Sequence, residues 1–409
     1  MNIRCLRCKG SNPDNCGRAF CPITAKSEAR FKVEKSLNRD FQGSSPSPFI
    51  GRFGYPYVNV GFLSPPEIKD NAWLYDAPRY WSSHNYNISR IIGFRSELIN
   101  SSKKAFVKGM GKTLEIARQI GMASAPVDLE VNLQDRPRFS LQTDSYLAPQ
   151  GPNAKLKKAS ITSNPRIHTK IDRAVSDTGL KAADAVTYLY RNNFDENILS
   201  KLLSVGALGI KKSRKLVPTR WSITAADDML GKDLINEIKK YPESDYKLHF
   251  GSYLGNYYYI LLFPDVWGYE LFETYMPHVS WNITKDIRFT TDYEPYSGRK
   301  YYAGNCAGGY YTVRLAIAEH LKKIRRQASV LAIRVITGEY AAPLGVWVTR
   351  QAARKAMQNK PISFASEKLM LSYTKAMIKK KFSRSIGSIM HQSRLLREFT
   401  QQKKLTAFI

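Results

Sequence analysis

Four of the five cysteines in this chain lie close together at its N-terminus, and their spacing constrains how that end can fold. They follow the pattern Cys-x2-Cys, seven residues, then Cys-x4-Cys, at positions Cys5, Cys8, Cys16 and Cys21. Four thiolates can close a tetrahedron around one zinc ion, and Gly10 and Pro13 favour the turn that brings the two pairs together. We therefore expect residues 1–25 to form a structural four-cysteine zinc module, because no coordination position is left open for chemistry.

Other states of these cysteines stay open at this point. An iron–sulfur cluster also takes four cysteines, and four free thiols or two local disulfides are the alternatives without a metal. The N-terminus has no apolar signal segment, and no run of the chain is apolar for long enough to cross a membrane. We therefore expect a cytoplasmic protein, in which a reducing environment favours metal binding over disulfides. Cys306 is expected to be a lone buried cysteine.

The charge of the chain points to a polyanionic partner. Lysine and arginine number 63 against 34 acidic residues, which gives a formal net charge of +29. Such a field attracts nucleic acid at long range, although a membrane surface, an RNA-rich assembly or plain solubility are alternatives. Hydrophobic residues make up 43% of the chain and aromatic residues 12%, so most of the chain is expected to fold. Mixing of cations with aromatic residues favours nucleic acid over the other partners.

Hydrophobic periodicity predicts a mixed α/β fold for residues 26–400, with a candidate subdivision near 150–170. The chain is polar and basic there, as is typical of a linker or of a loop that faces DNA. Helices are expected at residues 89–121, 170–191, 196–203, 227–239, 311–327, 348–357 and 367–399. Strands are expected at residues 127–133, 139–143, 272–281 and 330–336, with a hairpin of buried strands at 247–263. The body is thus expected to combine helices and sheets, between the zinc module and a flexible tail at residues 401–409.

A basic stretch in the middle of the chain is the candidate nucleic-acid contact. It consists of Lys211, Lys212, Arg214, Lys215, Arg220 and Trp221. Lysine and arginine suit phosphates, and the indole ring can stack on a base, although Trp221 could equally lie in the core. Asp227 and Asp228 follow and are candidate catalytic residues that could hold Mg²⁺ beside phosphates. The alternative is that Thr224 caps a helix whose N-terminal dipole the two carboxylates complement.

The last eight residues resemble the box by which proteins bind the DNA sliding clamp, Gln-x-x-aliphatic-x-x-aromatic-aromatic. The matching positions are Gln402, Leu405, Phe408 and Ile409, of which Ile409 replaces the second aromatic residue. Leu405 and Phe408 are three residues apart, so one 3₁₀ turn would point both side chains into a single apolar pocket. Packing of the same residues on the body is the alternative. A terminal position favours a peptide that folds on its partner.

Three further stretches resemble the archaeal Nre family. They are Gly-Arg-Phe-Gly-Tyr-Pro at 51–56, Lys-Leu-Val-Pro-Thr-Arg-Trp-Ser-Ile-Thr-Ala at 215–225 with Asp227 and Asp228, and Pro-Leu-Gly-Val-Trp-Val-Thr-Arg at 343–350. Together with both ends of the chain, the resemblance spans nearly the whole sequence. It implies a role in DNA damage repair and binding of the clamp, PCNA, through the terminal box.

The expected function is therefore a nucleoid-associated DNA repair factor that binds DNA through a basic surface and is recruited to PCNA by its tail. A second hypothesis is a metal-dependent nuclease that uses Asp227 and Asp228, together with Asp135 or Asp144. A third is an RNA-binding protein, which explains the charge but leaves the terminal box unexplained. Whether the protein is an enzyme is left open by the sequence.

Overall fold

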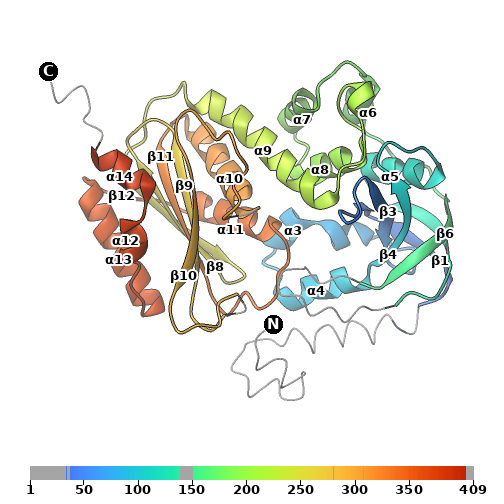
Figure 1. Cartoon of the computed structure of the whole chain (residues 1–409), viewed down its shortest axis with the longest axis horizontal. Coiled ribbons are helices and arrows are strands. Elements are labelled where there is room, and N and C mark those ends of the chain that lie inside the picture. Colours follow the sequence, from blue (N-terminus) through green and yellow to red (C-terminus); the bar gives the residue numbers. More distant parts are fainter. Residues whose placement is uncertain (1–33, 35–36, 139–150, 280, 307, 402–409) are drawn as a thin grey trace. The chain divides into compact units, whose positions relative to one another are not determined.

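A computed structural model describes residues 34, 37–138, 151–279, 281–306 and 308–401. The described chain divides into two compact units. Unit 1 contains the described residues up to Leu230 together with Ala341–Gly345, and unit 2 contains Gly231–Tyr340 and the described residues from Val346 onward. The N-terminal cysteines, the strand expected at 139–143 and the clamp-like box lie outside the described residues. The expected mixed α/β body is confirmed, since each unit contains one six-stranded sheet (Figure 1).

The sheet of unit 1 has the order β1-β5-β6-β4-β3-β2, and its pairs are antiparallel except for β4 with β6. Its strands are β1 Asp40–Ser45, β2 Ser47–Ile50, β3 Tyr57–Ser64, β4 Ile99–Phe106, β5 Val127–Leu133 and β6 Asn153–Ile161. The linker expected at residues 150–170 is wrong, because β6 is an interior strand of this sheet. The strand has a weak hydrophobic pattern, because only its residues Leu156 and Ala159 are fully buried. Its extended conformation is instead stabilised by pairing with β4 and β5 on its two edges.

The core of unit 1 follows from alternation along its strands. In β5, Val127, Leu129, Val131 and Leu133 are buried while the residues between them are less so, as the two-residue repeat of a strand requires. Helix α5, Lys112–Met122, places Ile116 and Ile120 in the same cluster. The sheet therefore buries one face against this helix.

Some helices of unit 1 differ in extent from those expected from the sequence, and α9 begins at Thr219, eight residues before the helix expected at 227–239. The helices of this unit are η2 Ala72–Asp76, α3 Pro78–Ser83, α4 Ile88–Glu97, α5, α6 Thr169–Ser176, α7 Ala182–Arg191, α8 Glu196–Ser204, η3 Lys211–Ser213 and α9 Thr219–Ile238, which continues into unit 2. The single helix expected at residues 89–121 is wrong, because these residues form α4, strand β4 and α5. β4 is polar, with Ser101, Ser102, Lys103 and Lys104, so its strand character comes from pairing with β3 and β6.

The helix expected at residues 170–191 is also divided in two. Between α6 and α7, the Asp177 carboxylate accepts hydrogen bonds from the backbone nitrogens of Gly179 (2.9 Å) and Leu180 (3.0 Å). An aspartate that bonds its own downstream backbone competes with helix formation and favours a turn. This local interaction ends α6, and α7 begins only at Ala182.

The sheet of unit 2 has the order β10-β9-β11-β8-β7-β12. Its strands are β7 Lys247–Tyr253, β8 Asn256–Phe263, β9 Gly268–Tyr275, β10 Arg288–Glu294, β11 Ser329–Ile336 and β12 Ile362–Ser363. The hairpin expected at residues 247–263 and the strand at 330–336 are confirmed. β11 pairs in parallel with β9 and antiparallel with β8, so it is covered on both edges, which fits its nearly continuous apolar sequence.

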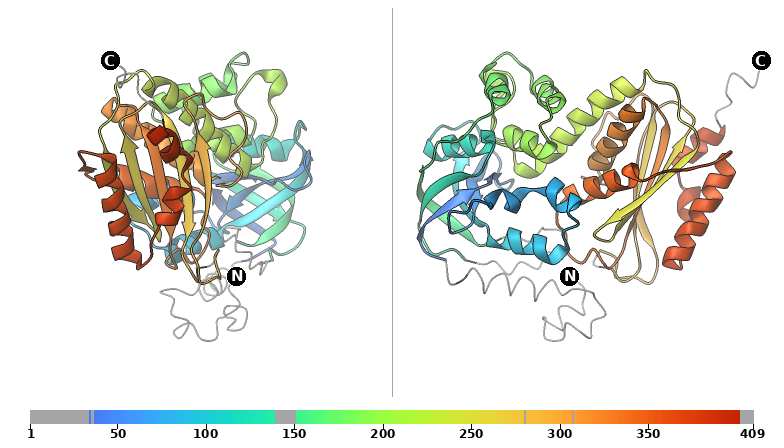
Figure 2. Two further views of the ribbon diagram at one scale, coloured as in Figure 1. Left: turned by 60° about the vertical axis from the view of Figure 1, so that its left-hand side comes forward. Right: turned by 180° about the vertical axis from the view of Figure 1, so that it is seen from behind.

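Helices cover both faces of the second sheet (Figure 1 and Figure 2). They are α10 Gly309–Ile324 and α11 Trp347–Gln358 on one face, and α12 Glu367–Phe382, α13 Gly387–His391 and α14 Arg394–Gln401 on the other. Gly251 of β7 allows the close approach of α11, because a Cβ there would lie 2.6 Å from the Cα of Ala356. On the other face, Met370, Ile378 and Leu395 join the strand side chains in one apolar cluster.

The continuous helix expected at residues 367–399 is wrong, because it is divided into α12, α13 and α14. Ser383 follows α12 with a φ of +54°, a left-handed conformation that ends a helix. Before α14, the Ser393 hydroxyl accepts from the Leu396 nitrogen at 3.1 Å, as an N-terminal helix cap does. These two breaks let the segment fold back over the sheet.

Two histidines contact each other inside unit 2. The rings of His249 on β7 and His320 on α10 have centroids 4.7 Å apart, and His249 is completely buried. Burial, followed by repulsion from His320, lowers the pKa of His249 to about 4, and burial, followed by repulsion from Lys323 and Lys247, lowers the pKa of His320 to about 4 as well. Both imidazoles are therefore neutral in the folded protein near neutral pH.

We expect unit 2 to lose stability as the pH falls from about 6.5 to about 4. In this window an unfolded chain protonates His249 and His320 while the folded chain does not, so protons favour unfolding; above about 6.5 neither state is charged, and below about 4 the effect levels off. The loss should be about 2–3 kcal/mol for each histidine. Urea denaturation across this range measures it. A His249→Gln/His320→Gln variant should be less dependent on pH between 5 and 6.5, and an unchanged slope would contradict the assignment.

Within the described ranges, no helix combines the length and the apolar composition that a membrane crossing requires.

Candidate nucleic-acid interface

The loop between β2 and β3 presents aromatic side chains to solvent. The loop closes through hydrogen bonds from the Gly51 nitrogen to the Asn59 oxygen and from the Tyr57 nitrogen to the Gly54 oxygen, each 2.8 Å long. Gly54 has a φ of +80°, a conformation that side chains with a Cβ rarely adopt. Phe53 beside it is 78% exposed. A short, internally bonded loop thus holds a large apolar ring in water.

Backbone hydrogen bonds bring this loop next to the segment that precedes α9. The Val107 nitrogen donates to the Pro56 oxygen (3.0 Å), and the Leu216 nitrogen donates to the Val107 oxygen (2.9 Å). At the start of α9, the hydroxyl of Thr219 accepts from the Ile50 nitrogen at 3.0 Å. Three stretches that are distant in the sequence are therefore fixed side by side within unit 1.

Exposed aromatic rings pair across these stretches. The ring centroids of Tyr55 and Trp221 are 5.4 Å apart, and those of Tyr57 and Phe106 are 5.2 Å apart. Each of these four side chains is at least 40% exposed, and Trp221 is 47% exposed. The alternative placement of Trp221 in the core is therefore wrong. These spacings are typical of favourable tilted aromatic pairs, so the pairs orient one another while part of each ring remains open to solvent.

Cations are interleaved with the rings. The guanidinium of Arg52 lies 4.8 Å from the centroid of the Phe53 ring, and the ammonium of Lys215 lies 5.9 Å from that of Tyr55. We call this set the aromatic–basic surface. It comprises Arg52, Phe53, Tyr55, Tyr57, Phe106, Lys215 and Trp221. Alternating positive charge and exposed π-faces is the chemistry of a surface that binds the backbone and the bases of nucleic acid.

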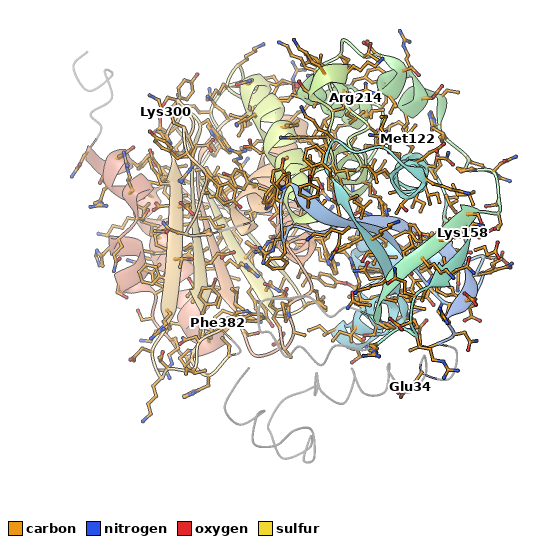
Figure 3. All side chains as sticks on the ribbon, turned by 45° about the vertical axis from the view of Figure 1, so that its right-hand side comes forward. Glu34, Met122, Lys158, Arg214, Lys300 and Phe382 are labelled. Carbon is orange, nitrogen blue, oxygen red and sulfur yellow. The ribbon has the colours of Figure 1, made fainter. Side chains whose placement is uncertain are left out.

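Of the basic stretch predicted from the sequence, Lys215 and Trp221 lie in this surface, and Arg220 is exposed beside Trp221. Lys211 and Lys212 are exposed on η3. Arg214, labelled in Figure 3, is engaged inside the unit: its guanidinium donates to the carbonyl oxygens of Gly209 (2.6 Å), Val175 (2.8 Å) and Asp177 (2.9 Å). Arg214 therefore stabilises the turn after α8. The N–H donors that a phosphate would need are already used in these hydrogen bonds.

The electrostatics around Arg214 are consistent with a crowded basic region. Partial burial, followed by repulsion from Arg118, lowers the pKa of Arg214, while Asp177 opposes the shift. Arg118 belongs to helix α5, so cations from separate elements come together on this side of unit 1. A concentration of positive charge of this kind attracts phosphates.

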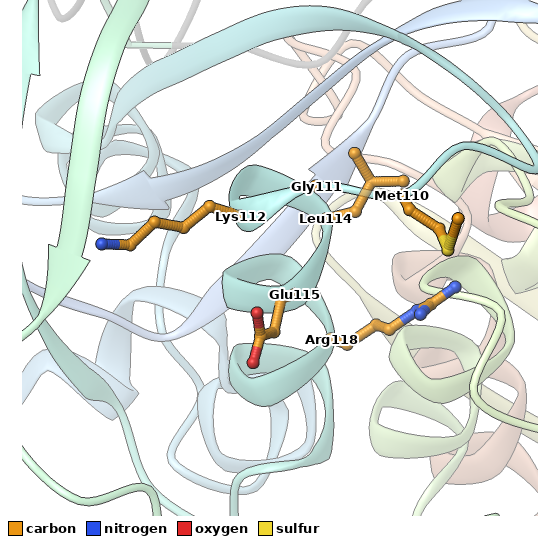
Figure 4. Close-up of a pocket in the computed structure, with 6 residues that line it drawn as sticks. All are labelled: Met110, Gly111, Lys112, Leu114, Glu115 and Arg118. Carbon is orange, nitrogen blue, oxygen red and sulfur yellow. The ribbon is translucent and has the colours of Figure 1, made fainter.

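An open pocket of about 440 Å³ lies at the start of α5 (Figure 4). It is lined by Met110, Gly111, Lys112, Leu114, Glu115 and Arg118. The Gly-Met-Gly-Lys-Thr sequence here joins a strand to a helix, but the Lys112 side chain extends away from Arg118 (Figure 4). The stretch is not a phosphate-binding loop, because Phe106 stands where that motif requires its first glycine.

The two candidate catalytic carboxylates lie within helix α9. Asp227 is completely buried, and Asp228 is half-buried. The helix begins at Thr219, where the Pro218 carbonyl accepts from the Trp221 nitrogen at 2.8 Å. The capping explanation is therefore wrong, because Thr224 lies in the second turn and its hydroxyl bonds back to the Arg220 oxygen at 3.5 Å.

The structure does not bring the other predicted acidic residues to the Asp pair. Asp135 is exposed after β5, and Asp144 lies outside the described residues, as do Cys5, Cys8, Cys16 and Cys21. Among the residues that the structure describes, no group of three or more His, Cys, Asp and Glu side chains could hold a metal ion. Cys306 is buried and free, as expected.

Five members of the aromatic–basic surface were missed by the sequence analysis. They are Arg52, Phe53, Tyr55, Tyr57 and Phe106. The available signal was the Gly-Arg-Phe-Gly-Tyr-Pro stretch, in which large aromatic residues stand between turn-forming residues, so that they cannot all be buried by a regular element. Nothing local in the sequence indicates that this stretch lies beside Trp221.

Comparison with known proteins covers nearly the whole chain. The family model for the N-terminal part of archaeal Nre proteins matches residues 15–282, and the model for the C-terminal part matches residues 294–408. DNA repair protein NreB of Archaeoglobus fulgidus is 37% identical over 88% of this chain and 89% of its own. DNA repair proteins NreA of the same organism and of Haloferax volcanii are 36% and 34% identical, over 90% and 80% of this chain and 91% and 80% of their own.

No solved structure matches this chain. The resemblance noted at residues 51–56, 215–225 and 343–350 is confirmed, since all three stretches fall within the two matched regions. On the match of both regions and on three relatives that align over most of their length, the chain belongs to the archaeal Nre family.

Proposed function

We propose that this protein is a DNA repair factor that binds DNA through the aromatic–basic surface of unit 1 and is recruited to the sliding clamp PCNA by residues 402–409. The observation that carries the DNA-binding part is the assembly of exposed rings and cations from three distant stretches, on a chain with a net charge of +29. The relatives named as DNA repair proteins support the process in which it acts.

The clamp-binding part is supported by how firmly α14 is attached to unit 2. Phe399 of this helix has its ring centroid 5.2 Å from that of Phe263 and 6.4 Å from that of Tyr246. The box begins three positions later in the sequence, at Gln402. A box attached so closely would hold unit 2 next to the clamp and raise the local concentration of the protein at clamp-loaded DNA.

The cations of the surface provide the test of DNA binding. In an Arg52→Gln/Lys215→Gln variant, we expect weaker binding of a labelled duplex and a shallower dependence of log affinity on log salt, by roughly 1–2 in slope, since each lost phosphate contact removes about 0.9. Fluorescence anisotropy at several salt concentrations measures both quantities.

A matched control removes two exposed lysines of the same unit. Lys157→Gln/Lys158→Gln changes the net charge by the same amount on strand β6, which carries none of the residues of the aromatic–basic surface; Lys158 is labelled in Figure 3. Equal effects from both pairs would mean that binding follows net charge and not this surface. Tighter binding of RNA than of DNA by the same residues would favour the RNA-binding hypothesis over repair.

The zinc module is the remaining part of the proposal. We expect metal analysis of the purified protein to find about one zinc ion per chain, because Cys5, Cys8, Cys16 and Cys21 supply a complete set of four thiolates. Cys5→Ser/Cys16→Ser should remove the zinc, whereas Cys306→Ser, a buried cysteine of unit 2, should retain it. Iron with the visible absorption of a cluster would instead establish the iron–sulfur alternative.

A further inference from the structure

Deepening the function proposed above, we propose that the aromatic–basic surface binds unpaired DNA, by stacking bases on Phe53 and on the Tyr55–Trp221 pair while Arg52 and Lys215 contact the adjoining phosphates. The inference rests on the proposal that this surface binds DNA. It adds the class of substrate, which neither the charge of the chain nor the family match specifies.

The chemistry of the exposed groups favours bases over duplex phosphates. Cations alone suffice to bind a duplex, whose π-faces are stacked on one another and hidden. Here five exposed aromatic rings and two cations lie on stretches that backbone hydrogen bonds hold side by side, and the most exposed of these rings, Phe53, is more than three-quarters exposed. An aromatic face that remains in water after folding is available to stack on a base that has lost its partner.

The spacing of the groups suits a strand that alternates bases and phosphates. Arg52 lies on the ring of Phe53, and Lys215 lies on the ring of Tyr55, so these two stacking rings each have a cation less than about 6 Å from the centroid. Trp221 extends the platform beyond Tyr55, at a tilt of 48° between the two rings. A cation beside Phe53 and another beside Tyr55 can neutralise the phosphates of the nucleotides whose bases are stacked there.

The platform is held in place before any ligand arrives. The loop that carries Phe53 and Tyr55 is closed by two hydrogen bonds of 2.8 Å, and the link through Val107 fixes it to the segment that carries Lys215. Trp221 is placed by the first turn of α9, whose Thr219 hydroxyl accepts from Ile50 at the end of β2. A preordered platform loses little conformational freedom on binding, which makes stacking more favourable.

The test compares single-stranded and duplex DNA on the full chain, using a labelled thymine-rich oligonucleotide of about 16 nucleotides, the upper end of the site size of one binding module, and a hairpin duplex of the same length. We expect tighter binding of the single strand. A Phe53→Leu/Trp221→Leu variant, which removes two rings and keeps apolar bulk, should bind the single strand about 5- to 150-fold more weakly for each stacked base lost. Its salt dependence should stay unchanged, because no charge is removed.

Two matched variants test whether a loss of affinity comes from removing the aromatic rings of this surface. Trp73→Leu removes another exposed tryptophan of unit 1, which packs edge-on against Tyr80, and should leave affinity unchanged. Phe53→Tyr/Trp221→Phe keeps both aromatic faces and should retain most of the single-strand binding. Because the substituted side chains are exposed, the thermal unfolding of all variants should match that of the parent protein, and this is checked by circular dichroism.

Cross-linking supplies an independent readout. A single strand that contains 5-iodouracil, irradiated in complex with the protein, should form adducts in peptides that contain Phe53, Tyr55 or Trp221. The absence of binding to any DNA would overturn the proposed function itself. Binding of duplex as tightly as single strand, or an equal loss on both for the ring variant, would overturn the stacking inference while DNA binding stands.

Discussion

Replacing both Leu405 and Phe408 by alanine is expected to weaken binding of this protein to PCNA by several orders of magnitude. The two side chains are spaced to enter one apolar pocket from a single 3₁₀ turn. Each should contribute about 1.5–3 kcal/mol by burial, so the double variant should lose about 3–6 kcal/mol, or roughly 10²- to 10⁴-fold in affinity. Calorimetric titration of the full-length protein into PCNA measures the change directly.

Variants within the same eight residues sharpen this experiment. Lys404→Ala/Thr406→Ala changes neighbouring positions that the box leaves free, and it should bind PCNA nearly as well as the parent protein. Ile409→Phe restores the second aromatic residue of the box and should strengthen binding. The affinity of the Leu405→Ala/Phe408→Ala variant for DNA should be unchanged. If the Leu405→Ala/Phe408→Ala variant binds PCNA as tightly as the parent protein, the clamp contact lies elsewhere on the protein and the proposed recruitment by the tail is wrong.

Removing the carboxylate of Glu273 is expected to cause a large loss of stability in unit 2. Arg334 on β11 is buried, and its guanidinium pairs with Glu273 on β9 at 2.5 Å and donates to the Asn256 side chain through Nε at 3.0 Å. Burial by itself disfavours the charge of Arg334, but Glu273 together with Tyr258, Tyr340 and Tyr275 outweighs it, so the pKa of Arg334 is raised. Glu273→Ala would leave this cation buried without its counter-charge.

The expected cost is about 3–5 kcal/mol in the free energy of unfolding, measured by urea denaturation followed by circular dichroism. Asp245→Asn is the control, since it breaks an ion pair of the same unit whose carboxylate is 80% exposed, and it should cost no more than about 1 kcal/mol. Glu273→Leu/Arg334→Met replaces the pair with apolar side chains and should recover much of the loss. Equal losses in the free energy of unfolding for Glu273→Ala and Asp245→Asn would show that the buried pair stabilises unit 2 no more than an exposed pair does.

Some of the fold could be predicted because the pattern along the chain is strong and local. The helices near residues 311–327 and 348–357 correspond to α10 and α11, and the hairpin at 247–263 corresponds to β7 and β8. In these segments, the residues that face the core recur with the period of the element that they form. The two units and their sheets could not be predicted in the same way, since a sheet is made by pairing between distant strands.

Three of the errors share this cause. β4 and β6 are polar strands in the interior of the first sheet, and their neighbours on both edges supply the hydrogen bonds that hold them extended. Arg214 was predicted to contact nucleic acid, yet its donors are taken up by three carbonyl oxygens that the sequence does not place near it. The type of a polar residue limits the groups with which it can bond, but the partner that it meets depends on the fold.

The amino-acid sequence alone is enough to establish the charge of the chain, its family, the four-cysteine pattern and the clamp-like box, because each of these depends on which residues are present or on spacing over a few positions. The pairing of Tyr55 with Trp221, with Lys215 beside them, emerges only from the folded protein. Their meeting depends on the order of strands in the first sheet and on hydrogen bonds between β2, the end of β4 and the start of α9. Contacts of this kind are set by the packing of whole elements, and no local sequence pattern records them.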